Sequence, residues 1–340
     1  MTDNHEYRLS WVDRLQKLAE RFPYGPWGLY LLLAFIVLVW FYALRWSYHP
    51  AELLQLSVPW TWTAVFTPML LAIGYMTDRI AAQSLDRFRP GLEIEDAEFA
   101  QSSYGLSTTP PQLVIFGHLI AALFFLGMLW IDPTWFDLIG GDPLSDATIN
   151  IVRWLNVSMI AIGLFGHIRK LSIVAALHQK ATNLGLIDWE PIFAFSRLAF
   201  WIAATLIFVP TALFIIFLAF SENFFAFAGV IVAYAVAALA FFLPLRGLNN
   251  LLVKEKMYLL SQVRRRIRGT SEKLHTMVDR SELSNMEALY GVLAALILEE
   301  EYLEKLRTWP WPKGMVLRLL GLIAIPVLIF VVQSLIDQLI

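Results

Sequence analysis

Residues 27–46, WGLYLLLAFIVLVWFYALRW, form an unbroken apolar run with tryptophan at both ends. A helix needs about 20 such residues to cross the hydrocarbon core of a bilayer. Tryptophan favours the headgroup layer on either side of that core. A secretory signal would have a shorter apolar stretch and a small-residue cleavage site. The run therefore predicts a retained transmembrane helix.

The rest of the chain is also strongly apolar. Hydrophobic residues make up 58% of its 340 residues and charged residues 16%, against about 45–50% and 25% in soluble domains. The sequence predicts an all-α, polytopic membrane bundle of about seven transmembrane helices. The second predicted helix is weakened by Pro68 and the fourth by Arg153 and Asn156. The six further segments are 60–78, 112–131, 149–167, 196–220, 224–245 and 315–335.

Basic residues alternate between the connections. Lysine and arginine collect on the cytoplasmic side of membrane proteins. Three of the 26, Arg45, Arg153 and Arg318, lie at or inside the ends of predicted helices, and the other 23 fall on one side when seven helices are counted. The pattern predicts a cytoplasmic amino terminus and an external carboxyl terminus. The connections without lysine or arginine are 47–60, 132–150, 221–224 and the chain after 318.

Two parts outside the predicted bundle have helical periodicity. In residues 1–25, Trp11, Leu15, Leu18 and Phe22 share one face of a helix. This amphipathic helix either lies on the inner membrane surface or packs against the rest of the protein.

Residues 246–313 predict a cytoplasmic helical hairpin between helices six and seven. A break is expected at Gly269-Thr270-Ser271, and a second arm begins near Ser284. The chain is thus expected to have four parts. Residues 1–25 form an amphipathic helix, and residues 26–245 form transmembrane helices one to six. Residues 246–313 form the hairpin, and residues 314–340 form transmembrane helix seven.

Three stretches resemble a family of uncharacterised prokaryotic multi-pass membrane proteins. They are Asp86–Asp96, Leu186–Phe200 and Trp309–Lys313. The resemblance implies this topology and a bacterial or archaeal plasma membrane, but no activity.

Ionisable groups inside a membrane are costly and are therefore candidates for function. Asp78, His118 and His167 are expected at similar depth, where a carboxylate and two imidazoles could relay protons or hold a divalent cation. The alternatives are solvation at the interface for Asp78 and His167, and a hydrogen-bonded helix contact for His118. Arg153 either attracts anions at an outer mouth or extends its side chain to the headgroups.

Two prolines and one arginine run complete the candidates. Pro210 and Pro326 fall near the middle of predicted helices five and seven. There they either act as hinges or form ordinary packing kinks. Basic residues cluster in the hairpin and could bind an acidic partner, meet anionic lipid or remain solvated. The run consists of Arg264, Arg265, Arg266 and Arg268.

The sequence leaves several functions open. Channel, transport or membrane-sensor activity is the leading expectation, because the hairpin feeds directly into the last helix. The odd helix count and the cytoplasmic extensions are similar to the architecture of insect chemoreceptor channels. The alternatives are a scaffold that recruits a cytoplasmic protein through the hairpin and a lipid-modifying enzyme.

No nucleotide, metal or nucleophile motif is present. The chain also lacks cysteine and has a net charge of −2. We therefore expect no cofactor, no nucleic-acid partner and no enzymatic activity. The expected partners are the bilayer, a second copy of the chain and a cytoplasmic protein.

Overall fold

The computed structural model is all-helical in the residues it describes, with 88% helix. These residues are 8–133, 143–181, 189–216, 224–280, 286–312, 314–324 and 328. Two short 3-10 turns, Pro50–Glu52 and Arg89–Gly91, join helices along the chain. The α-helices are α1 (Trp11–Glu20), α2 (Gly25–Tyr48), α3 (Val58–Phe88), α4 (Asp96–Ser107), α5 (Pro111–Ile131), α6 (Pro143–Gln179), α7 (Trp189–Ile216), α8 (Phe224–Asp279) and α9 (Met286–Lys305). A further helical segment spans Met315–Ala324.

Within the described residues, five helical regions are long and apolar enough to cross a membrane, which confirms the membrane class predicted from composition. They contain α2, α5, α6, α7 and the first part of α8. Their outer faces carry bare apolar side chains, such as Leu31, Leu123 and Trp130, which is 88% exposed. Such a surface needs lipid to cover it. The second and seventh predicted crossings are not among the five: α3 falls outside them, and the seventh segment, 315–335, lies largely outside the described residues.

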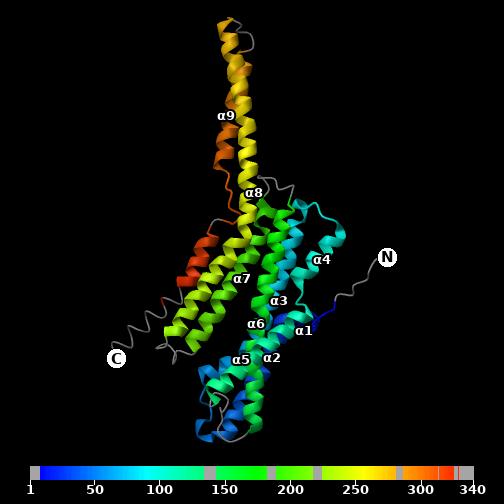
Figure 1. Cartoon of the computed structure of the whole chain (residues 1–340), viewed down its shortest axis with the longest axis vertical. Coiled ribbons are helices and arrows are strands. Elements are labelled where there is room, and N and C mark those ends of the chain that lie inside the picture. The colour runs from blue at the N-terminus through cyan, green and yellow to red at the C-terminus, as the bar shows by residue number, and fades with distance from the viewer. Residues whose placement is uncertain are drawn as a thin grey trace, which may run out of the picture.

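The bundle is organised around α3 and α6. Helix α3 packs against α2, α6 and α7, and α6 also packs against α5 and α8. We call the end of the bundle from which α8 and α9 project the hairpin end (Figure 1). At the end of α3, Phe88 packs edge-on against His178 and in a tilted arrangement against Phe195. The His178 ring nitrogen Nδ1 lies 2.9 Å from the Pro244 carbonyl, which holds α8 to α6.

Helices α8 and α9 form a long hairpin that projects from one end of the bundle (Figure 1). Leu260, Val263 and Leu303 form its small core. Arg264 bridges to Glu300 at 2.6 Å and to Glu304 at 2.7 Å. On α9, a hydrogen bond from Lys305 lowers the pKa of the Glu301 carboxyl. Packing and exposed ion pairs together hold α9 against α8.

The expected break at Gly269-Thr270-Ser271 is wrong. Helix α8 continues through these residues to Asp279 and has 56 residues. Glycine inside a helix costs only about 1 kcal/mol, which the surrounding helix and hairpin contacts outweigh.

Candidate functional site

The amino-terminal helix α1 packs against the bundle with both apolar and polar side chains. Ser10 and Asp13 form a reciprocal capping box at its start. Asp13 Oδ1 also accepts a hydrogen bond from the Thr109 backbone N–H at 2.9 Å. Meanwhile Trp11 and Leu18, from the predicted apolar face, are exposed. The helix thus packs against the protein and still presents apolar side chains outward.

A buried ion pair lies beneath α1. Lys170 Nζ of α6 lies 2.7 Å from Asp78 Oδ1 of α3, and both side chains are less than a tenth exposed. Gln16 Nε2 of α1 donates to Asp78 Oδ2 at 2.9 Å. The Asp78 carboxylate is therefore held by one cation and one amide, drawn from helices far apart in sequence. Such pairs depend on both partners, because either charge alone would be buried without compensation.

His167 lies one turn from Lys170 along α6, and the two line the same small cavity as Asp78, of about 50 Å³. The structure thus brings two of the three expected residues, Asp78 and His167, to one cavity. The His167 side chain is buried, and its Nδ1 has no hydrogen-bond partner among the described residues. No group of three or more His, Asp and Glu residues suited to a metal ion occurs in that part of the chain.

His118 is placed elsewhere. Its ring stacks on Trp154 with centroids 4.7 Å apart, and Trp11 Nε1 donates to its Nε2 at 3.3 Å. His118 therefore links α5, α6 and α1 and does not line the cavity of Asp78 and His167. Arg153 donates to Asn150 one turn away on α6, at 3.2 Å.

The other sequence candidates have separate positions. Pro210 lies inside α7 and lines an apolar cavity between the helices, whereas Pro326 lies outside the described residues. In the arginine run, Arg264 is paired with α9. The exposed side chains of Arg265, Arg266 and Arg268 have no ion pair among the described residues.

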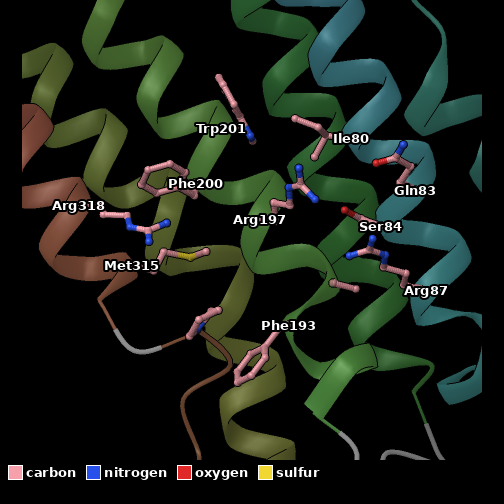
Figure 2. A pocket seen from close by; sticks show the side chains of 12 residues that line it. Ile80, Gln83, Ser84, Arg87, Phe193, Arg197, Phe200, Trp201, Met315 and Arg318 are labelled. Carbon is pink, nitrogen blue, oxygen red and sulfur yellow. The ribbon is translucent and has the colours of Figure 1, made fainter.

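A cavity of about 580 Å³ lies between α3, α7 and Met315–Ala324, at the hairpin end. Three arginines line it, and they come from these three elements: Arg87, Arg197 and Arg318. Figure 2 shows Arg87 and Arg318 reaching in from opposite sides, with Arg197 between them. We call it the arginine cavity.

The arginine cavity has an excess of positive charge. Its described lining contains no aspartate or glutamate, and Gln83 and Ser84 supply its neutral polar groups. Within the described residues, none of the three guanidinium groups has an ion pair. Three like charges around one space repel each other, so an anion bound there would relieve that repulsion. Guanidinium groups are suited to phosphate and carboxylate because they donate two parallel hydrogen bonds.

The cavity also has an apolar wall. Phe200 and Trp201 follow Arg197 by about one turn on α7, and Ile80 precedes Arg87 by two turns on α3. A ligand here would meet both guanidinium groups and aromatic side chains. This arrangement matches a molecule with an anionic head and an apolar body.

The segment before the last helix ties the cavity to the hairpin. Trp311 packs against Phe241 and Phe242 of α8, with centroids 5.6 Å apart in each case, and stacks on Trp309. Lys256 Nζ of α8 donates to the Glu304 and Leu306 carbonyls. These contacts connect the segment that precedes Arg318 to the base of the hairpin.

Sequence reasoning missed the arginine cavity. In the sequence, Arg87 and Arg197 count among the basic residues that set the topology and lie in two of the stretches that resemble a known family, and Arg318 lies inside a predicted helix. Their signal was present but weak: each is an arginine near the end of an apolar segment. The spacing of residues along one chain does not show that three such ends meet.

Helices and cavities together define an all-helical membrane protein with a cationic cavity at its hairpin end. Comparison with protein-family models, curated proteins and solved structures finds no match for this chain. The family resemblance and the likeness to chemoreceptor channels therefore gain no support from these comparisons.

Proposed function

We propose that the protein is a membrane sensor that binds an anionic phospholipid of the inner leaflet in the arginine cavity and passes its occupancy to the hairpin. The observation that carries this proposal is the convergence of Arg87, Arg197 and Arg318 on one cavity without a lining carboxylate. Anionic lipids are enriched in cytoplasmic leaflets, where they attract basic groups. Binding would fix Met315–Ala324 against α3 and α7.

Lipid binding is tested with the purified full-length chain by native mass spectrometry. We expect the protein to retain phosphatidylglycerol in preference to phosphatidylcholine. The variant Arg87→Gln/Arg197→Gln/Arg318→Gln should lose at least about tenfold in affinity, since hydrogen bonds to charged groups contribute about 1.5–3 kcal/mol each.

A matched control removes the same charge from the hairpin. The variant Arg265→Gln/Arg266→Gln/Arg268→Gln should bind phosphatidylglycerol like the wild type. Equal losses in both variants would contradict a specific site, because general attraction to basic residues would then explain the binding. If excess inorganic phosphate displaces the lipid, the ligand of the arginine cavity is a free anion and not a lipid.

The proposal needs the seven-helix topology, with the hairpin in the cytoplasm. The chain has no cysteine, so single cysteines can be labelled without background. With Leu56→Cys, which is exposed between α2 and α3, a membrane-impermeant maleimide should react in intact cells. With Val278→Cys, at the far end of α8, reaction should require permeabilised cells. If Leu56→Cys reacts only in permeabilised cells and Val278→Cys reacts in intact cells, the topology is inverted. The arginine cavity would then not face the inner leaflet, and the proposal would fail.

Transport or channel activity is the second proposal. Its support is Pro210, which lines a cavity within the predicted membrane region. Proline removes a backbone hydrogen bond and so allows a helix to bend. Ion flux into liposomes that contain only the purified protein would favour this proposal over a sensor.

A lipid-modifying enzyme receives less support. The Asp78 carboxylate is occupied by Lys170 and Gln16, and His118 contacts tryptophans away from it. A scaffold role rests on the exposed arginines of the hairpin. It predicts a soluble protein that co-purifies with the wild type and is lost from the variant lacking Arg265, Arg266 and Arg268.

A further inference from the structure

A second cavity, separate from the arginine cavity, lies between α3, α6, α7 and α8. Its volume is about 330 Å³, which falls in the range of small-molecule sites. Of its fifteen lining residues, only His167 and Thr205 have polar side chains. We call it the His167 cavity.

The His167 cavity opens toward the lipid-facing surface. Val232 and Val236 of α8 line it and are 62% and 42% exposed. Gly163 of α6 and Gly229 of α8 also line it, and a Cβ added at either would meet no atom within 4 Å. The helices therefore leave room that ordinary side chains could have filled.

His167 joins this cavity to the polar cluster beneath α1. Together with Leu70, Met159 and Gly163, it also lines the small cavity that contains Asp78 and Lys170. Its ring is buried, and Nδ1 has no partner in the described chain. A buried polar group without a hydrogen bond costs about 1–3 kcal/mol, so a ligand that supplied the missing partner would recover that cost.

The surroundings define the charge of such a ligand. Lys170 is already neutralised by Asp78 at 2.7 Å, so the polar end offers no free charge to an ion. The remaining wall is apolar, and an unpaired charge placed against it would be strongly unfavourable. A neutral ligand avoids that cost.

We infer that the His167 cavity binds a neutral, largely apolar molecule from the bilayer, of the long-chain alcohol or ketone class, whose single oxygen pairs with the His167 imidazole. The apolar body lies along α7 and α8 near Pro210, and the oxygen points toward α1. This site is independent of the anionic site between α3, α7 and Met315–Ala324.

Photolabelling of the full chain in lipid nanodiscs tests this inference. The probe is decanol that carries a diazirine on its chain, and labelled peptides are mapped by mass spectrometry. We expect labels on α6 near Gly163 and on α7 near Pro210. Unlabelled decanol should compete about tenfold better than decane, which has the same chain but no oxygen; this ratio corresponds to about 1.4 kcal/mol.

Three variants sharpen the test. Gly163→Leu fills the cavity and should reduce labelling by at least about fivefold, whereas Gly127→Leu on α5, where space is also open, should leave it unchanged. His167→Phe keeps a ring of similar size, so labelling should persist while the preference for decanol over decane disappears. The inference is overturned if Gly163→Leu labels like the wild type, or if decane competes as well as decanol with the wild type.

Discussion

Replacing Lys170 by methionine should destabilise the protein by about 3–5 kcal/mol, because it leaves the buried Asp78 carboxylate without its cation. Lys170 and Asp78 are 6% and 7% exposed, and their charged atoms lie 2.7 Å apart. Gln16 would remain as a hydrogen-bond donor to Asp78, but an amide carries no compensating charge. The free energy of unfolding is measured by SDS titration in mixed micelles, followed by circular dichroism.

The double variant Asp78→Asn/Lys170→Met provides the control. It removes both charges while keeping side chains of similar size, so most of the lost stability should return. Together with the single variant Asp78→Asn, the double variant completes a cycle that gives the coupling energy of the pair. A loss below about 1 kcal/mol in Lys170→Met would mean that the pair behaves like a solvated surface salt bridge, and the description of a buried cluster would then be wrong.

This pair also shows what the sequence could and could not provide. Asp78 and His167 were predicted to lie at one depth because each ends an apolar segment, and they do line one cavity. Lys170, three residues beyond His167, is one of the 23 basic residues that the sequence places on the cytoplasmic side. A helical turn brings it back toward α3, but hydropathy does not show which neighbour a helix faces.

Helix α8 gives the complementary lesson. The helical periodicity of 246–313 predicted the hairpin, and the structure has one helix from Phe224 to Asp279. Local turn residues at 269–271 predicted a break that does not occur. The periodicity is the stronger signal, because it reflects the packing of a whole helical face. A single glycine reflects only a small local cost in helix stability.

Glycine at position 117 is expected to be nearly irreplaceable, for a reason that is visible only in three dimensions. A Cβ there would collide with Ile162 Cγ1 of α6 and lie 3.2 Å from the Ile162 backbone nitrogen. Small residues allow membrane helices to approach this closely, and close packing is what holds such helices together. The contact of α5 with α6 therefore depends on the missing side chain.

The variant Gly117→Leu should force α5 away from α6 and destabilise the protein by about 3 kcal/mol, at the upper end of typical overpacking costs. His118 would move with α5, so its stacking on Trp154 and its hydrogen bond from Trp11 should weaken as well. The unfolding titration and the fluorescence of the tryptophans measure the two effects.

Gly127→Leu is the matched control for this substitution. It lies on the same helix, but a Cβ there meets no atom within 4 Å, and leucine has a higher helix propensity than glycine. Its stability should therefore equal or exceed that of the wild type. If both leucine variants lose stability equally, the cost arises within α5 itself, and the close crossing of α5 and α6 is not what holds His118 and α1 in place.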